Sequence, residues 1–326
     1  MDSFRTLLAV KPATYTIGIK DPLFTVGSCF ADNLGQLLLR YKFQVLVNPF
    51  GTQYNPVSIH KVLGYALQGG QPLSHTYGEL NGTHFNYDFH SSFSTLDRNR
   101  LEKTIRQTLA QAHSFIASAA VVVITYGTAW VYERKDNHEV VSNCHKMPAA
   151  LFTKSLLTQK KILASFDPLY NALLSINPSL KIILTISPVR HLKDTLELNA
   201  VGKSVLRLAC HTISTTYRQV DYFPAYEIVM DDLRDYRFYN DDLLHPSPQA
   251  IRYIWKLFSS RYFTDHTRAF VQQWETIQKA LEHRPFLPAS SAHQQFLKEL
   301  LTQLQELKSV VNVDKEWNEI QGQILK

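Results

Sequence analysis

The sequence contains few cysteines and no long apolar run. Only Cys29, Cys144 and Cys210 occur among 326 residues. An odd number without framework spacing argues against a secreted domain held by disulfides and favours a reducing compartment. No apolar run approaches the roughly 18 residues that a membrane-spanning helix needs. The segment Met1–Arg5 lacks the pattern of a signal peptide. We therefore expect a cytoplasmic protein without a membrane partner.

Positive charge is only slightly in excess of negative charge. Lys and Arg number 34 and Asp and Glu number 28, so the formal net charge is +6. The basic residues are scattered, and the densest run, Gln159–Ile162, is too short to follow a phosphate backbone. We therefore expect no nucleic-acid partner. The 45% of hydrophobic residues is typical of a folded globular chain.

Internal repeats and low-complexity segments are also absent. What recurs is a short apolar strand followed by a helical pattern, which is typical of a parallel α/β sheet. The runs 120–126 and 181–186 are rich in β-branched residues, and this predicts strands covered on both faces. The other expected strands are 23–26, 43–47 and 225–229, and the expected helices are 30–40, one starting at 55–56, 97–117, 153–176 and 196–217.

Residues 71–95 interrupt this alternation. They are polar, aromatic and rich in turn formers, so we expect an insertion with little regular structure. Further along, 130–133 and 139–142 flank a polar turn, which indicates a hairpin.

The C-terminal part has a different pattern. Apolar residues recur at helical spacing over about 266–283 and 292–311. These stripes either pack within their own chain as a helical hairpin, which we favour, or form a dimer seam. We expect an α/β domain over residues 1–263 and a C-terminal helical extension over 264–326. The oligomeric state stays open.

Chemically useful residues follow the predicted strands, where ligands bind in open α/β sheets. A thiol or hydroxyl at the start of a helix, as at Ser28 and Cys29, lies at the positive end of the helix dipole, which favours its anion. A histidine needs an orienting carboxylate, and Asp242 lies three residues before His245. These are ingredients of an acyl-transfer site. The sequence has no G-x-S-x-G motif, which excludes an ordinary α/β-hydrolase.

The pentapeptide Gly27–Ala31 reads G-S-C-F-A, and the sequence resembles the GSCFA family, which looks like a branch of the SGNH (GDSL-like) hydrolases. The resemblance covers most of the chain, including Asn48–Gly51, Asn143–Lys146, Ser187–His191 and His245. It implies a three-layer α/β/α sandwich with a parallel sheet, of SGNH or flavodoxin-like type. It also implies a nucleophile after the first strand, a Gly after the second, an Asn after the third and a terminal Asp-x-x-His.

The resemblance implies Cys29 as the nucleophile, with Ser28 as the alternative, His245 as general base and Asp242 as its orienting carboxylate. One departure is that Ser28 stands where the superfamily's G-D-S has Asp. A second is that the expected G-x-N-D reads Gly127-Thr128-Ala129-Trp130, so the usual oxyanion Asn is missing. Asn143 or the Thr128 hydroxyl is the candidate replacement.

Further candidates for oxyanion and substrate contacts are Gly51, Asn143, His145, Lys146, Arg190 and His191. Each also has a purely structural interpretation, as a turn glycine, a polar loop or a salt bridge. We expect no cofactor. The set His75, His84, Asp88 and His90 lacks the rigid spacing of a zinc site, so we expect no metal.

The expected function is that of an SGNH-like hydrolase of an ester or acyl group, acting through a covalent acyl-enzyme. Its partner would be a small-molecule or glycan acyl ester, that is, a carbohydrate or another small acylated substrate. Two alternatives stay open. One is an acyltransferase that uses the same site, and the other is a non-catalytic glycan- or ligand-binding protein with a degenerate SGNH pocket.

Overall fold

Five parallel strands form the central sheet of the computed structural model, which describes residues 6–325. In sheet order they are β10 (Val220–Phe223), β9 (Lys181–Ile186), β5 (Val121–Tyr126), β1 (Leu23–Gly27) and β2 (Val45–Val47). Counted along the chain, this is the order 2-1-3-4-5 of flavodoxin-like folds. The strand order reverses between β1 and β5, where Gly27 lies opposite Thr125. The expectation about Met1–Arg5 lies outside the described residues.

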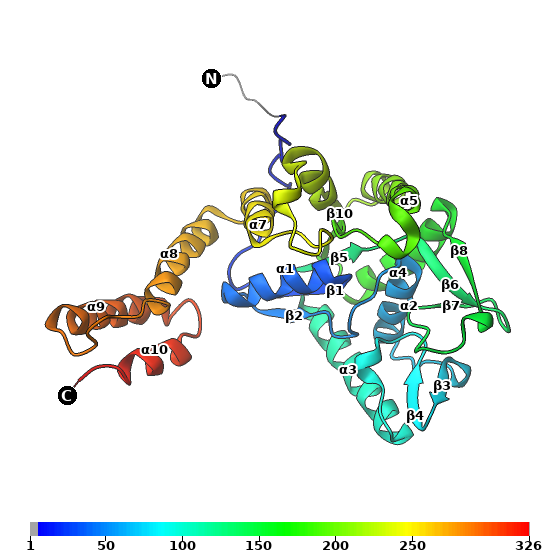
Figure 1. Ribbon diagram of the computed structural model, residues 1–326, viewed down its shortest axis with the longest axis horizontal. Coiled ribbons are helices and arrows are strands. Elements are labelled where there is room, and N and C mark those ends of the chain that lie inside the picture. Colours follow the sequence, from blue (N-terminus) through cyan, green and yellow to red (C-terminus); the bar gives the residue numbers. More distant parts are fainter. Residues whose placement is uncertain (1–5, 326) are drawn as a thin grey trace.

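Helices cover both faces of this sheet because successive strand residues face opposite sides and are apolar on both (Figure 1). On β5, Val121 and Val123 belong to one apolar cluster, and Val122 and Ile124 belong to another. The first cluster includes α1 (Cys29–Arg40) and α7 (Pro248–Tyr262), and the second includes α2 (Pro56–Leu67), α3 (Arg98–Ser118), α4 (Gln159–Ile176) and α5 (Thr195–Thr216). The predicted three-layer sandwich with a parallel sheet is confirmed.

The predicted insertion 71–95 is more regular than expected. It contains an antiparallel hairpin of β3 (Tyr77–Leu80) and β4 (Thr83–Asn86). Phe85 of β4 is 2% exposed and packs in a small apolar cluster with Phe152. The hairpin forms because these aromatic side chains are buried, so their abundance was a sign of packing rather than of irregular structure.

The predicted helix at 153–176 was wrong at its start. The segment taken as the start of a helix at 153 is the strand β8 (Phe152–Leu156), which pairs with β6 (Trp130–Arg134). The predicted hairpin is present, because β6 also pairs with β7 (Val140–Val141). Helix α4 begins only after Thr158, whose side chain caps it.

The segment predicted as the last strand, 225–229, is helical. It forms α6 (Ala225–Glu227) and continues into a π-helical turn, Ile228–Leu233. The strand lies earlier, at β10, where Asp221 interrupts the apolar pattern. The Asp221 carboxylate accepts a hydrogen bond from Arg261 Nη2 at 2.7 Å, so an ion pair with a residue of a distant helix satisfies it. Such a partner cannot be read from the local sequence.

Three further helices, α8 (Asp265–Leu281), α9 (Ser291–Leu307) and α10 (Asp314–Gln321), form the C-terminal extension. Figure 1 shows α9 and α10 at one end of the molecule, away from the sheet, with α8 leading to them. Trp274 and Leu304 are 1% and 0% exposed in the single chain. Their burial supports the hairpin that packs within its own chain rather than a dimer seam.

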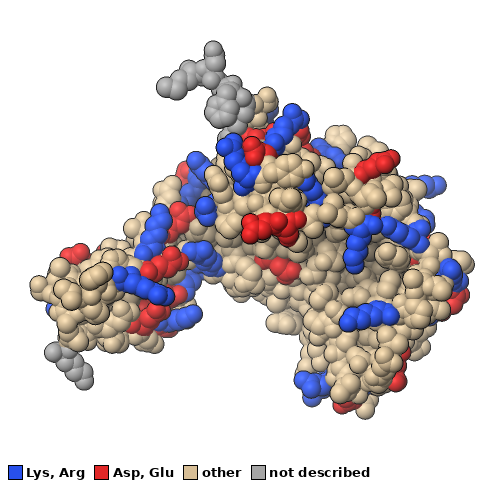
Figure 2. All heavy atoms as spheres, viewed as in Figure 1, with Lys and Arg blue, Asp and Glu red and all other residues tan. Residues whose placement is uncertain are grey.

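The surface carries both signs of charge. Figure 2 shows Lys and Arg interspersed with Asp and Glu on the face in view, without one continuous basic field there. Among the helices of residues 6–325, none combines the length and the apolar character needed to cross a membrane.

Candidate active site

The turn after β1 depends on Gly27. Its φ is +132°, and a Cβ at this position would overlap the carbonyl oxygen of Thr125 on the neighbouring strand. Asn48, which follows β2, binds both sides of this glycine. The Gly27 N–H donates to Asn48 Oδ1 at 3.0 Å, and Asn48 Nδ2 donates to the Gly27 carbonyl at 3.1 Å. Strands β1 and β2 therefore fix the position of the turn that begins at Ser28.

Ser28 and Cys29 occupy different environments at the start of α1. Ser28 is the N-cap and is fully buried, and its Oγ accepts the Phe30 N–H at 3.4 Å. This is the usual role of a serine at a helix start. Cys29 is the first helical residue and is only partly buried. Of the two candidate nucleophiles, the thiol is thus the accessible one.

His245 and Asp242 come to Cys29 from the loop before α7. His245 Nε2 lies 3.8 Å from Cys29 Sγ, and His245 Nδ1 lies 2.6 Å from Asp242 Oδ2. The other carboxylate oxygen accepts the N–H groups of Leu244 and His245 at 2.9 and 3.0 Å. These backbone donors and the imidazole lower the pKa of Asp242 to about 2. The carboxylate is therefore charged near neutral pH and orients the imidazole, whose Nε2 faces the sulfur.

The electrostatic surroundings of the Cys29 thiol oppose one another. Burial and the nearby Asp32 raise its pKa, whereas Lys203 and the backbone N–H groups of Cys29 and Phe30 lower it. The net direction is upward, so Cys29 rests as a thiol at neutral pH. This corrects the expectation that the helix N-terminus alone would favour the anion. Desolvation outweighs the backbone donors, and ionisation needs a base such as His245.

Lys203 is a site neighbour that the sequence analysis missed. It lies on α5 and is 2% exposed, and its Nζ donates to the carbonyl oxygens of Gly127 at 2.7 Å and Ser187 at 2.6 Å. Its place in the sequence held a signal, because Lys203, Leu206 and Cys210 follow helical spacing on the buried face of α5. A lysine within an apolar stripe is rarely buried without a specific partner.

Gly51 does not direct its amide at this site. Its N–H donates to Asn48 O at 2.9 Å. Its φ is +73°, and a Cβ there would collide with the His90 side chain. Gly51 therefore closes a turn and allows a close approach of His90, which corrects its expected part in an oxyanion hole. Thr128 follows β5, and its Oγ1 accepts the Trp130 N–H at 3.0 Å.

Asn143, His145 and Lys146 gather in a different place. They line a cavity of about 400 Å³ together with residues of the β3–β4 hairpin, and Cys29, Asp242 and His245 are not among its lining residues. Asn143 Oδ1 accepts the His145 N–H at 2.8 Å. His145 stacks on Phe85 with ring centres 4.4 Å apart, and burial lowers its pKa to about 4. These contacts hold a loop against the hairpin, and the convergence of Asn143 with the nucleophile stays a prediction.

Arg190 and His191 lie behind the loop that carries His245. The Arg190 guanidinium lies 4.3 Å from the centre of the Tyr239 ring, and its backbone N–H donates to Leu244 O at 3.4 Å. The His191 ring meets Tyr54 edge-on at 5.4 Å. Burial and Lys203 lower the pKa of His191 to about 4, so it is neutral.

The four residues weighed as metal ligands contact other side chains. His75 contacts Glu139, His84 contacts Glu79, Asp88 contacts Lys61, and His90 contacts Ser92. In the part of the chain that the structure describes, no group of three or more His, Cys, Asp or Glu side chains is arranged to hold a metal ion.

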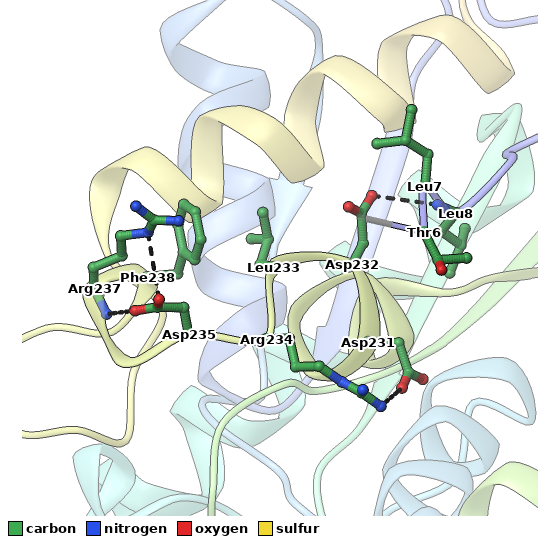
Figure 3. Close-up of a pocket in the computed structure, with 10 residues that line it drawn as sticks. All are labelled: Thr6, Leu7, Leu8, Asp231, Asp232, Leu233, Arg234, Asp235, Arg237 and Phe238. Carbon is green, nitrogen blue, oxygen red and sulfur yellow. Dashed lines mark hydrogen bonds and ion pairs between the residues drawn. The ribbon is translucent and has the colours of Figure 1, made fainter. Parts of the chain in front are cut away.

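A larger cavity, of about 810 Å³, lies between Thr6–Leu8 and residues 231–238 (Figure 3). Four of its charged side chains form ion pairs, Arg234 with Asp231 and Arg237 with Asp235. Asp232 accepts the Leu8 N–H at 3.4 Å. The residues of the Cys29 site do not line it. The candidate active site is instead an open one, in which the His245 side chain is 40% exposed.

Comparison with known proteins places these residues in a family context. The GSCFA family matches residues 22–258, and the C-terminal domain of GSCFA domain proteins matches residues 274–326. A comparison with curated proteins gives no significant match.

Among solved structures, a carbohydrate esterase family 3 protein from Talaromyces cellulolyticus shares 8% identity over 78% of this chain and 99% of its own, with a TM-score of 0.34. A family 3 carbohydrate esterase from Clostridium thermocellum shares 10% identity over 77% of this chain and 99% of its own, with a TM-score of 0.36. A candidate platelet activating factor from Streptococcus pneumonia shares 11% identity over 74% of this chain and 83% of its own, with a TM-score of 0.39. Likenesses this distant carry no argument about the chemistry of this chain.

Proposed function

This chain belongs to the GSCFA family, and we propose that it hydrolyses an ester or acyl group through a covalent acyl-enzyme on Cys29. The observation that carries the proposal is the continuous contact from Asp242 to His245 to Cys29, with distances of 2.6 and 3.8 Å. A nucleophile, a base within reach and a third group that orients the base are the parts that covalent acyl transfer requires.

In the proposed first step, the Cys29 sulfur attacks the carbonyl carbon of the substrate while His245 Nε2 takes the thiol proton. The raised pKa of the thiol makes this transfer necessary. Asp242 stabilises the imidazolium that forms. His245 then returns the proton to the departing alcohol oxygen, the carbon–oxygen bond breaks, and a thioester remains on Cys29.

In the second step, water replaces the alcohol. His245 takes a proton from the water as its oxygen attacks the thioester carbonyl, and the returning proton releases the thiol and the carboxylic acid. The partial exposure of His245 and Asp242, at 40% and 45% of their side chains, supports access of water to the base.

The negative oxygen of the intermediate needs hydrogen-bond donors. The backbone N–H groups of Cys29 and Phe30 face the thiol of Cys29 and are assigned here to this role. The Thr128 hydroxyl is the side-chain candidate, because it follows β5 where the family resemblance calls for an Asn. Asn143 is not proposed for it, since it lines the separate cavity of the β3–β4 hairpin.

Turnover of p-nitrophenyl acetate tests the proposal. We expect Cys29→Ala to reduce turnover to background and His245→Ala to reduce it by about 10²–10⁴, the usual contribution of general-base catalysis. Ser28→Ala is the matched control, because it removes a neighbouring hydroxyl that caps α1, and we expect it to keep turnover within a few-fold. Turnover that survives Cys29→Ala but not Ser28→Ala would contradict the assignment. Tight binding of an acyl ester without any turnover would favour the non-catalytic alternative.

A further inference from the structure

The chain segment before α2 runs beside the nucleophile's turn. The Gln53 N–H donates to the Gly27 carbonyl at 2.8 Å, at the end of β1. The next residue, Tyr54, accepts with its carbonyl the N–H groups of Gly127 at 2.7 Å and Thr128 at 3.0 Å, after β5. These three hydrogen bonds hold the Tyr54 backbone between the ends of β1 and β5. The strand order reverses there, which is where ligands bind in open α/β sheets.

The Tyr54 ring lies against the same turn. A Cβ on Gly127 would lie 3.2 Å from Tyr54 Cδ1 and 3.3 Å from Ser28 Cβ, so the ring and the residue before Cys29 meet at one glycine. The His191 ring meets the Tyr54 ring edge-on, with ring centres 5.4 Å apart. Tyr54 is nevertheless 39% exposed. An aromatic side chain that is held by neighbours and still partly open offers a rigid apolar surface to a ligand.

We propose that Tyr54 is a specificity-determining residue, whose ring forms the acyl-binding wall of the Cys29 site and selects an apolar acyl chain longer than acetyl. This inference rests on the proposed function, because the acyl group in question is the one transferred to Cys29. Tyr54 takes no proton and forms no covalent bond in that reaction. It covers the apolar chain, so that binding of the chain contributes to kcat/KM.

The position of His245 indicates which part of the ester meets Tyr54. His245 precedes α7, whose buried residues share one apolar cluster with those of α1, whereas Tyr54 precedes α2, whose buried residues belong to the cluster on the other face of the sheet. The two residues therefore come to the site from opposite faces. Because His245 protonates the departing oxygen, the alcohol lies on its side, and the acyl chain extends toward Tyr54.

The surroundings of the ring favour an apolar chain. Leu192 follows His191 and is 50% exposed, and Leu243 precedes His245 by two residues and is 49% exposed. Burial is the main cause that raises the pKa of the Tyr54 hydroxyl, so the ring is uncharged near neutral pH. An uncharged ring with apolar neighbours gains from each methylene group that it removes from water. A charged or strongly polar acyl group would need polar partners instead.

The test measures kcat/KM for p-nitrophenyl acetate and p-nitrophenyl hexanoate, which differ only in the acyl chain. We expect the wild type to prefer the hexanoate. In Tyr54→Ala, the ratio of hexanoate to acetate should fall by about tenfold, as loss of apolar contacts to a chain does. Tyr54→Phe keeps the ring and should keep the ratio. Tyr132→Ala is the matched control, because it removes a tyrosine of β6 that is 44% exposed, and it should keep the wild-type ratio.

A hexanoate-to-acetate ratio that stays at its wild-type value in folded Tyr54→Ala would overturn the inference. A second comparison, between p-nitrophenyl and ethyl hexanoate, varies only the alcohol. A change in this alcohol ratio without a change in the acyl ratio would place the ring against the alcohol and would also overturn the inference. If Tyr54→Ala does not fold, Tyr54→Gln replaces it with the same expectation, because glutamine keeps a long side chain and removes the ring.

The outcome is separable from that of the proposed function. If Cys29→Ala retains turnover and the acyl ratio still falls in Tyr54→Ala, the nucleophile assignment fails and the acyl wall stands. If Cys29→Ala abolishes turnover and the acyl ratio does not move, the mechanism stands and the inference fails. If the protein turns over neither ester, saturation-transfer NMR with sodium hexanoate decides. Transfer to the hexanoate methylene groups that is lost in Tyr54→Ala supports the acyl wall, and equal or absent transfer in both proteins overturns it.

Discussion

Helix α1 joins two regions of the molecule that are built differently. At its N-terminal end, Cys29 is partly exposed, and its contact to His245 is a 3.8 Å approach between a thiol and an imidazole on an open loop. At its C-terminal end, Trp274 is 1% exposed and donates from Nε1 to Arg40 O at 2.8 Å. At the N-terminal end, the polar groups stay accessible for further contacts. At the C-terminal end, the polar groups are paired and the apolar surface is covered.

The N-terminal end of α1 therefore serves the candidate site, and its C-terminal end contributes to stability. A site must leave a nucleophile and a base accessible, which sacrifices burial. The C-terminal extension has no such requirement, so it packs against Arg40, Tyr41 and Lys42 with hydrogen bonds and an ion pair. Substitutions at the two ends should therefore move different measurements.

The largest expected effect is on stability, at the C-terminal end. Trp274→Ala leaves a large cavity under α8 and removes the hydrogen bond to Arg40, and we expect a loss of about 3–5 kcal/mol in the free energy of unfolding. Chemical denaturation measures it. Trp317→Ala on α10, whose side chain is only partly buried, is the control with a smaller loss. A marked change of the Cys29 alkylation rate in Trp274→Ala, at a temperature where this variant is folded, would contradict the separation of function and stability between the two ends of α1.

Asn48→Ala should affect both stability and turnover, because Asn48 supports the turn at the site. It removes both hydrogen bonds to Gly27 and leaves the buried Gly27 N–H without its acceptor, while the Gly27 carbonyl still accepts the Gln53 N–H at 2.8 Å. We therefore expect a loss of about 1–3 kcal/mol in the free energy of unfolding. Asn48→Gly separates the cause, since the position has a φ of +42° that glycine adopts freely. A stability loss in Asn48→Ala that Asn48→Gly fully restores would assign the effect to backbone strain instead.

Asp32→Asn should shift the pH dependence of the site. Because the Asp32 carboxylate raises the pKa of Cys29, its removal lowers that pKa, and the alkylation profile should move to lower pH. Asp265→Asn on α8 removes a similar charge from the C-terminal extension and should leave the profile in place. A movement of the Asp32→Asn profile to higher pH would refute the charge arrangement described for Cys29.

The smallest effect belongs to the ion pair of Lys42 and Glu316, which links α1 to α10 at 2.8 Å. We expect Lys42→Met to lower the free energy of unfolding by about 1 kcal/mol or less, since such pairs gain little beyond their desolvation cost. A double-mutant cycle with Glu316→Gln measures the coupling. A coupling above about 3 kcal/mol would mean that this end of α1 is held mainly by charge rather than by apolar packing.

The sheet was predictable from the sequence where strands are continuous and apolar, as at Val121–Tyr126 and Lys181–Ile186. It was not predictable where a strand contains a charge with a distant partner. Asp221 of β10 pairs with Arg261, forty residues away, and the more apolar helical segment after it was taken for the strand. Local pattern cannot register such a partner.

The site shows the same division. Cys29, Asp242 and His245 were identified because the pentapeptide and the Asp-x-x-His spacing mark them directly. Lys203 was missed because a single lysine in a helical stripe has no motif, and its two carbonyl partners come from strand ends. The cavity that Asn143 lines was not foreseen, because it depends on the β3–β4 hairpin, which the sequence did not reveal.

The proposed function requires that Cys29 becomes acylated during turnover. Acid quenching of the protein during turnover of p-nitrophenyl acetate, followed by peptide mapping by mass spectrometry, detects this acyl group. We expect an acetyl group on Cys29 in the wild type and in Ser28→Ala, and none at this position in Cys29→Ala. Ester turnover with an acetyl group that maps to Ser28, or with an unmodified Cys29 under conditions where deacylation is slow, would contradict it.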